Sequence, residues 1–227
     1  MGSAVIIGAS GGIGGALADA IEDEGGYDRV WRFSRKDGFD LTDEASIAAA
    51  AARVAEGPAP TLVIVATGIL HDGERGPEKA LKDLDADWLA RVYAVNAIGP
   101  ALVAKHFIPL FPRIGTPTLA ALSARVGSIG DNALGGWHGY RASKAALNMM
   151  LRNIAIEARR KYDRTIVVGL HPGTVDTDLS KPFQGNVASG SLFTPDRAAM
   201  QLLDVLEGLK PHDSGKVFAW DGAEVPF

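Results

Sequence analysis

The chain of 227 residues contains no cysteine, so it can form no disulfide bond and use no thiolate in catalysis. Absence of cysteine suits a reducing compartment, and we expect a cytoplasmic location. The chain also lacks any apolar run of the ~18 residues that a membrane span requires. Its first apolar run, 4–7, is too short for the core of a signal peptide. We therefore expect a globular protein with no membrane partner.

Histidine is scarce and dispersed, which argues against a metal centre. The five histidines stand at positions 71, 106, 138, 171 and 212, and none has a second histidine four residues away. The formal net charge of −4 gives no reason to expect nucleic acid as a partner. The sequence therefore predicts neither a bound metal nor a nucleic-acid surface.

What the sequence does contain is a regular alternation of short apolar runs and longer helical stretches. The length fits a single domain over residues 1–227 with a substantial core. The alternation predicts an α/β fold, a single Rossmann-type doubly wound parallel sheet with helices on both faces. The expected strands are 4–7, 29–33, 61–66, 118–122, 165–170 and 216–219. The expected helices are 12–24, 43–55 with Thr42 as its N-cap, 85–110 with a disturbance at Pro100, 140–161 and 195–206.

Two stretches depart from this alternation. Only four residues separate the strand ending at Phe33 from a candidate third strand over 38–42, whereas a parallel crossover needs a dozen or more. We expect the sheet to be shortened there, with a loop in place of the crossover helix. The stretch 176–194 has little periodicity and contains Pro182, Gly185 and Gly190. A long loop after a strand's carboxyl end predicts a lid over a substrate site.

A glycine-rich turn lies between the first expected strand and the first expected helix. Gly8, Gly12 and Gly14 have the spacing G-x-x-x-G-x-G. Glycine lets backbone N–H groups approach a pyrophosphate at the positive end of a helix, although an ordinary tight turn is the alternative. The residues expected to contact a dinucleotide here are Gly8, Ser10, Gly11, Gly12, Ile13 and Gly14.

The end of the second strand bears on the choice of dinucleotide. In such folds an acidic residue there binds the ribose hydroxyl of NAD, and a basic residue accommodates the 2′-phosphate of NADP. Here Phe33 is followed by Ser34, Arg35 and Lys36, and the first carboxylate is Asp37. Arg35 can pair with a phosphate and Ser34 can donate to it, so NADP(H) is favoured over NAD(H). The alternative is a solvated basic loop.

Tyr140 and Lys144 are four residues apart, so on a helix both side chains leave the same face one turn apart. A phenol has a pKa of about 10, too high for easy proton transfer near neutrality. An ammonium beside it is expected to favour the phenolate and lower that pKa. The pair therefore indicates a proton donor and acceptor for a carbonyl or alcohol substrate.

Taken together, the chain resembles the short-chain dehydrogenase/reductase family over nearly its whole length. Within that family it is similar to the C-factor-like branch, which adjoins the carbonyl reductases and is named after a bacterial cell–cell signalling protein. The motifs that carry the resemblance, in family order, are Gly8-x-x-x-Gly12-x-Gly14, Asp40-Leu-Thr, Val95-Asn96-Ala, the serine region 123–128, Tyr140-x-x-x-Lys144 and Pro172-Gly-Thr-Val-Asp-Thr177.

The resemblance implies roles for the matched positions. Tyr140 would protonate the carbonyl oxygen, Lys144 would bind the nicotinamide ribose, and Asn96 would support a water-linked proton relay. A serine hydroxyl would hold the substrate oxygen, and the family often forms homodimers or higher homo-oligomers. The further cofactor contacts that it implies are Ser34, Arg35, Asp40, Leu41, Ala66, Thr67, Gly68, Asn96, Tyr140, Lys144, Pro172, Gly173, Val175 and Thr177.

The chain departs from the family pattern at the serine. Aligning on Gly127 places Ala124 where the family often has its active serine, so Ser123 or Ser128 must supply the hydroxyl, and both stay open. The family's Asn-Asn-Ala-Gly is also replaced, by the residues 65–68. Trp137, Phe183 and Phe193 could line an apolar substrate pocket or pack against the domain.

Three functions are compatible with these residues. The first is an NADP-dependent carbonyl reductase, or the reverse alcohol dehydrogenase. The second is a C-factor-like nucleotide-binding signalling protein with little or no turnover. The third is another chemistry on the same fold, such as epimerisation or dehydration.

Overall fold

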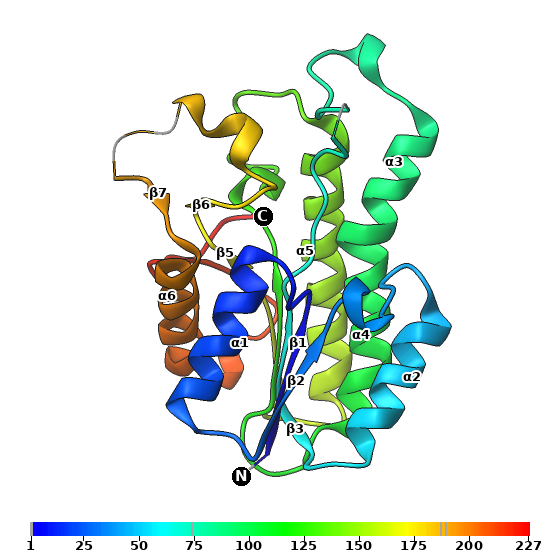
Figure 1. Ribbon diagram of the computed structural model, residues 1–227, viewed down its shortest axis with the longest axis vertical. Coiled ribbons are helices and arrows are strands. Elements are labelled where there is room, and N and C mark those ends of the chain that lie inside the picture. The colour runs from blue at the N-terminus through cyan, green and yellow to red at the C-terminus, as the bar shows by residue number, and fades with distance from the viewer. Residues whose placement is uncertain (1, 74, 187, 189) are drawn as a thin grey trace.

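The computed structural model describes residues 2–73, 75–186, 188 and 190–227. Its main sheet has six strands, all parallel, in the order β2-β1-β3-β4-β5-β8 (Figure 1). These strands are β1 Ser3–Ile7, β2 Arg29–Phe33, β3 Pro60–Val65, β4 Thr118–Leu122, β5 Ile166–His171 and β8 Val217–Ala219. Because the chain proceeds in opposite directions from β1, to β2 on one side and β3 on the other, the switch point of the sheet lies at β1.

Helices cover both faces of the sheet, which confirms the doubly wound α/β prediction (Figure 1). On one face lie α1 Gly12–Glu24 and α6 Pro195–Gly208, and on the other α2 Glu44–Ala55, α3 Ala86–Tyr93, α4 Gly99–Phe107 and α5 His138–Arg159. Successive residues of a strand point to opposite faces of the sheet, so alternate residues pack against the helix layer on one face or on the other. Val5 and Ile7 belong to one apolar cluster, Ala4 and Ile6 to the other, and all four are fully buried.

The shortened sheet edge is confirmed. In the described part of the chain no strand lies between β2 and β3, so β2 is the outer strand of the sheet. Gly38 has a φ of 76°, and Asp40 accepts a hydrogen bond from the Thr42 N–H, so the segment turns rather than extends. Phe39 and Leu41 are buried, and the segment therefore packs over the edge as a loop.

Most expected element bounds differ from the observed ones by at most two residues, and the exceptions have local causes. The N-cap of α2 is Asp43 rather than Thr42, because the Asp43 side chain accepts a bond from the Ala45 N–H. The helical stretch 85–110 is interrupted by a π turn at Ala94–Ile98 rather than at Pro100. Pro100 lies in the first turn of α4, where a missing N–H costs little.

The stretch 176–194 is less irregular than expected. It contains a 3₁₀ turn at Lys181–Asn186, and β7 Leu192–Phe193 pairs in parallel with β6 Thr174–Val175. Val187 and Ser189 belong to the expected lid but lie outside the described residues. Its role as a lid stays a prediction.

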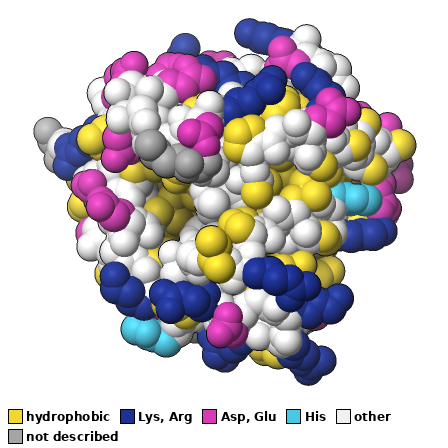
Figure 2. All heavy atoms as spheres, turned by 90° about the horizontal axis from the view of Figure 1, so that it is seen from below, with side chains coloured by type: hydrophobic (Ala, Val, Ile, Leu, Met, Phe, Trp, Pro, Cys, Tyr) yellow, Lys and Arg dark blue, Asp and Glu magenta, His cyan; other side chains and the backbone are white. Residues whose placement is uncertain are grey.

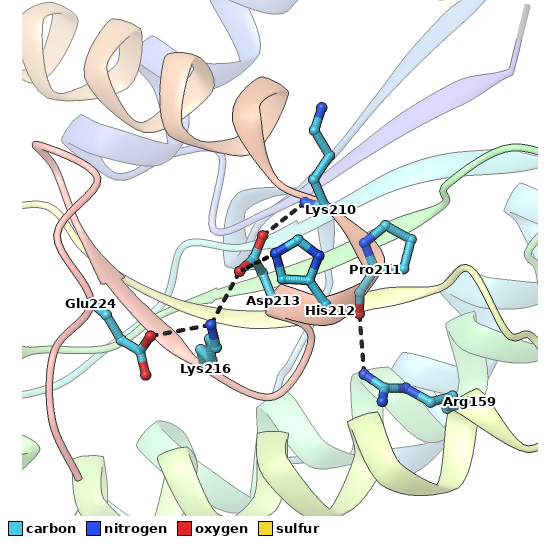
Figure 3. A network of polar contacts seen from close by, with 7 residues as sticks. All are labelled: Arg159, Lys210, Pro211, His212, Asp213, Lys216 and Glu224. Carbon is cyan, nitrogen blue, oxygen red and sulfur yellow. Dashed lines mark hydrogen bonds and ion pairs between the residues drawn. The ribbon is translucent and has the colours of Figure 1, made fainter.

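A network of polar contacts holds β8 to its surroundings (Figure 3). Asp213 accepts a bond from the Lys210 N–H at 3.0 Å and pairs with Lys216 at 3.2 Å. Lys216 also pairs with Glu224 at 3.2 Å, and Arg159 of α5 donates to the carbonyl of Pro211. The turn before β8, the segment after it and α5 are thereby joined.

The surface carries charges of both signs. On the face shown in Figure 2, basic and acidic side chains lie around the rim and hydrophobic ones nearer the centre. Across the described residues, no helix is both long and apolar enough to cross a membrane.

Candidate active site

The predicted site residues gather where β1, β3, β4 and β5 end. The glycine turn follows β1, residues 66–70 follow β3, Ser123 follows β4 and Pro172 follows β5. In open parallel sheets, ligands bind at this end of the strands and beside the switch point. The topology therefore brings most of the predicted residues together at the carboxyl ends of the strands.

The glycine turn is tightly packed. Gly8 has a φ of 92°, and a Cβ on Gly14 would lie 2.3 Å from the Gly8 carbonyl oxygen. A Cβ on Gly12 would lie 2.8 Å from Cγ2 of Thr177, which places the segment after β6 against the turn. A side chain at Gly8 or Gly14 would collide with backbone, and one at Gly12 would collide with the Thr177 side chain, so the turn depends on glycine for its shape.

The positive end of α1 faces outward without a cap. Gly11 is the N-cap, no side chain caps the helix, and its first turn has no acidic residue. Ser10, Gly11 and Gly12 are exposed, and the buried hydroxyl of Thr67 has no hydrogen-bond partner in the described part of the chain. Unpaired N–H groups at a helix start are an anion site. The residues present therefore fit a dinucleotide pyrophosphate.

The segment after β2 differs from the expectation in one respect. Ser34 is buried, and its hydroxyl donates to Asp37 Oδ2 at 2.6 Å, so its proton is not directed outward. Arg35 is exposed on the 3₁₀ turn Arg35–Asp37. Of the two expected phosphate ligands, only Arg35 presents its donor groups to solvent.

Asp40 and Leu41 both have structural contacts of their own. The Asp40 carboxylate accepts bonds from the N–H and hydroxyl of Thr42, which, with the Arg35 charge, hold the pKa of Asp40 below its usual value. Leu41 is buried against Gly99, where a Cβ would lie 2.5 Å from Leu41 Cγ. Their flanking of an adenine stays a prediction.

Lys144 lies in the centre of the site and is 2% exposed. Its ammonium donates to the carbonyl of Leu122 at 2.7 Å, and both Lys144 Nζ and Asn96 Oδ1 lie 3.6 Å from where a Cβ on Gly68 would stand. Burial lowers the pKa of Lys144 to about 7. A proton on this amine is therefore exchangeable near neutrality.

The expected depression of the Tyr140 pKa is not found. Lys144 Nζ lies 5.7 Å from the centroid of the Tyr140 ring, but burial raises the pKa of Tyr140 to about 12. The cause is desolvation, which disfavours the charged phenolate. The phenol is held in its protonated form, ready to donate.

Asn96 is fully buried and connects three segments. Its Oδ1 accepts a bond from the Ile69 N–H at 2.8 Å, and its Nδ2 donates to the Ile69 carbonyl and to Ser143 Oγ. Ser143 Oγ in turn donates to the carbonyl of Tyr140. Ser143 is not among the residues predicted from the sequence, although it lies within the Tyr-x-x-x-Lys motif, three residues after Tyr140.

The two candidate serines have different hydrogen bonds. Ser123 Oγ donates to Oδ1 of Asn148 on α5 at 2.6 Å, which commits its proton. Ser128 Oγ accepts a bond from the Asp131 N–H at 3.1 Å and keeps its proton for another acceptor. Both residues are buried, and Ala124 between them is buried as well. The choice between Ser123 and Ser128 stays open.

A series of ring contacts starts at Tyr140 and continues through Trp137 and Phe183 to His71. The Trp137 ring is edge-on to Tyr140, with centroids 6.4 Å apart, and lies 5.0 Å from the Phe183 ring. His71 lies 5.9 Å from Phe183, and its Nε2 is 3.1 Å from the carbonyl of Asp178. Phe193, by contrast, packs against Trp220. Trp137 and Phe183 thus form an apolar wall at the site, whereas Phe193 is part of the packing of the domain.

The segment after β5 is held in place by its own contacts and lies against the glycine turn at Thr177. Gly173 has a φ of 76°, and a Cβ there would meet the ring of Phe193 at 2.8 Å. The buried Val175 accepts a hydrogen bond on its carbonyl from Ser180 Oγ. Thr177 is half-buried beside Gly12. Three of the predicted cofactor contacts therefore lie in one ordered segment near the start of α1.

Comparisons with known proteins agree on one family. A family model described as enoyl-(acyl carrier protein) reductase matches residues 37–202. The C-signal of Myxococcus xanthus is 35% identical over 177 residues, which cover 78% of this chain and 98% of that protein. A 1-hydroxy-2-glutathionyl-2-methyl-3-butene dehydrogenase of Rhodococcus sp. (strain AD45) is 32% identical over 234 residues, covering 98% of each chain.

A solved structure supports the same relationship. The NADPH-bound carbonyl reductase from chicken fatty liver superposes with a TM-score of 0.83 at 27% identity, covering 99% of this chain and 94% of that one. The similarity therefore extends over the whole fold, including the segments that end at the candidate site.

Proposed function

Because the chain belongs to the short-chain dehydrogenase/reductase family, in its C-factor-like and carbonyl reductase branch, we propose that it transfers hydride between NADP(H) and a carbonyl or alcohol substrate. Membership makes it an oxidoreductase of that family. The observation that carries the finer proposal is the juxtaposition of the protonated Tyr140 with the buried amine of Lys144.

The residues around the glycine turn would hold the cofactor. The uncapped start of α1 and the glycines Gly8, Gly12 and Gly14 suit the pyrophosphate, and Thr177 lies against the turn at Gly12. Arg35 suits a 2′-phosphate as a bidentate donor. Bound NADPH would supply a hydride to the substrate carbonyl.

The chain's own contribution is the proton. Tyr140 donates its phenolic proton to the substrate oxygen as negative charge develops there. Lys144, fixed by the Leu122 carbonyl, would stabilise the resulting phenolate in its protonated form, which its lowered pKa of about 7 leaves only partly populated at neutral pH. Asn96 holds Ile69 and Ser143 around this pair.

Substitution Tyr140→Phe tests the proposal. It removes the proton donor and keeps the ring, so carbonyl reduction should fall by about 10² to 10⁴-fold while NADPH affinity is retained. The control is Tyr27→Phe, a partly buried tyrosine between α1 and β2. Unchanged turnover in Tyr140→Phe would show that another group gives the proton.

The similarity to the C-signal favours a second function, a nucleotide-binding signalling protein with little turnover. The occurrence of Ala124 at the family's serine position is compatible with it. Nucleotide binding together with inertness toward a wide panel of aldehydes, ketones and alcohols would favour this function over the first.

We further propose a homodimer or higher homo-oligomer in the cytoplasm. Exposed apolar side chains on the outer face of α5, including Met149 and Ile156, support an interface there. Sedimentation of the purified protein at the monomer mass would contradict it.

A further inference from the structure

Glu78 is a buried carboxylate to which the sequence analysis gave no role. It lies in the long segment between β3 and α3, and it is 3% exposed. Carboxylates are rarely buried to this extent unless hydrogen-bonded or paired. Its contacts are therefore informative about what it stabilises.

Both the backbone and the side chain of Glu78 contact the start of α5. The Glu78 carbonyl accepts a bond from the Trp137 N–H at 2.5 Å, and Glu78 Oε2 accepts one from the Gly139 N–H at 3.0 Å. A Cβ on Gly139 would lie 2.8 Å from Glu78 Oε1, so the carboxylate lies directly on this backbone. These two hydrogen bonds, from residues two positions apart, form a clamp on the helix start.

The clamp replaces an ordinary helix cap. Trp137 is the N-cap residue of α5, and no side chain of its own caps the helix. It has a φ of 49° and a ψ of 43°, which is a left-handed conformation. This conformation costs a non-glycine residue free energy, so it persists only where contacts with its surroundings stabilise it. The Glu78 carboxylate also complements the positive end of this 22-residue helix.

Tyr140 follows the clamped residues directly. The conformation of Trp137 sets both the first turn of α5, which carries Tyr140, and the direction of the indole ring that lies edge-on to it. A shift at Glu78 would therefore move the proton donor and the apolar wall formed with Phe183 together.

We propose that Glu78 is a positioning residue that fixes Trp137 and the start of α5 and thereby orients Tyr140. Its catalytic consequence rests on the proposed function, whereas its structural consequence does not. Glu78 itself contacts neither the phenol nor the amine of the pair in the described hydrogen bonds.

The test compares Glu78→Ala with Glu78→Gln and with Asp83→Ala. Gln has the same shape and can still accept the Gly139 N–H. Asp83 is the matched control, because it is an exposed carboxylate of the same segment that caps Lys79 and Ala80 but does not reach α5. Amide hydrogen exchange of residues 137–141 and steady-state kinetics are measured for each variant.

In Glu78→Ala, exchange at residues 137–141 should accelerate about tenfold, and kcat should fall about 10- to 100-fold while the NADPH Kd stays within about twofold. Glu78→Gln should restore slow exchange and most of kcat, and Asp83→Ala should leave both unchanged. Where Glu78→Ala does not fold, Glu78→Asp replaces it, since its shorter side chain keeps the charge but cannot reach Gly139.

Unchanged exchange in both Glu78→Ala and Glu78→Asp would overturn the clamp. Accelerated exchange with unchanged kcat would overturn the positioning of Tyr140. A complete lack of turnover in the unaltered protein would instead contradict the proposed function, and the exchange result would still decide whether Glu78 holds the helix start.

Discussion

Burial acts on Lys144 and Tyr140 in opposite directions. It lowers the pKa of Lys144 to about 7 and raises that of Tyr140 to about 12, because it disfavours the charged form of each group. At neutral pH the pair therefore contains a protonated phenol and an amine near the midpoint of its titration. This arrangement gives the amine a measurable influence on stability.

The stability of the fold should depend on pH through Lys144. Between pH 7 and 10.5 the unfolded chain keeps the proton that the folded chain has lost, so stability rises with pH in this window and is lost as pH falls toward 7. The variant Lys144→Met has no amine at this position, so its free energy of unfolding should lack this dependence on pH. The variant should be more stable than the unaltered protein at pH 7, and the difference in free energy of unfolding should shrink by about 1 kcal/mol per pH unit from pH 7 to 9. Urea unfolding at three pH values measures it, and a constant difference would contradict it.

The two serines should differ in their effect on turnover. Ser128 keeps its proton for another acceptor, whereas Ser123 gives its proton to Asn148. Ser128→Ala should therefore lower kcat about tenfold or more, and Ser123→Ala should chiefly lower the melting temperature. Steady-state kinetics and thermal unfolding of both variants test this expectation. A loss of kcat in Ser123→Ala, with only a lower melting temperature in Ser128→Ala, would identify Ser123 as the serine that binds the substrate oxygen.

Cofactor preference should depend on Arg35. Arg35→Asp replaces an exposed donor by a carboxylate that repels a 2′-phosphate, so NADPH affinity should fall by about tenfold or more while NADH affinity changes little. Lys36→Asp, the same charge change at the next exposed position, serves as control. Equal NADPH and NADH affinities in the unaltered protein would refute the preference.

At the scale of the element, the π turn at Ala94–Ile98 directs Asn96 inward. A widened turn changes which side chains face the core, and such turns are common at functional sites. Asn96 there holds both backbone groups of Ile69 and so fixes the segment that follows β3. The π turn therefore links the helix layer to the carboxyl ends of the strands, where the site lies.

Asn96→Ala should destabilise the protein strongly. It leaves the half-buried Ile69 N–H and carbonyl without their side-chain partner, at a cost of about 1–3 kcal/mol for the two groups together. Asn153→Ala, an exposed asparagine on α5, is the control. Chemical denaturation measures both variants, and equal stabilities would mean that Asn96 is not a structural anchor.

The elements could be predicted from sequence because they depend on short spacings. Apolar periodicity indicated the strands and helices, and the four-residue gap after Phe33 indicated the shortened edge. The Tyr140–Lys144 spacing indicated the reactive face. The partners of the buried polar groups could not be predicted in this way. Ser123 bonds to a residue 25 positions away, and Glu78 bonds to one 61 positions away. Such pairs depend on how helices dock, which local periodicity does not specify.

At the scale of the whole molecule, the network around Asp213 joins α5 to the turn between α6 and β8 and to the segment after β8 (Figure 3). Burial acts to raise the pKa of Asp213, but the bonds from the Lys210 N–H and the Lys216 ammonium outweigh it and hold the pKa below 3.8. The carboxylate therefore stabilises the last strand of the sheet over the whole neutral range.

Asp213→Ala should lower the free energy of unfolding by about 1 kcal/mol at pH 7. Because the pKa of Asp213 is depressed in the folded state, its contribution is present above pH 3.8 and is lost as pH falls below that value. The difference between Asp213→Ala and the unaltered protein should therefore diminish under acid. Thermal unfolding at pH 7 and pH 3 measures it, and an equal difference at both would contradict it.

The outer position of β2 has a consequence for self-association. An edge strand presents a row of backbone donors and acceptors to which another chain can add, and this is a route to aggregation. The exposed side chains of β2 include Arg29 and Arg32, and Arg29 lies over the ring of Trp31 at 3.5 Å. A second chain that approached this edge would have to desolvate both arginines. Because the sheet ends at β2, these two arginines lie on the strand that a second chain would have to join, and their charges disfavour its addition.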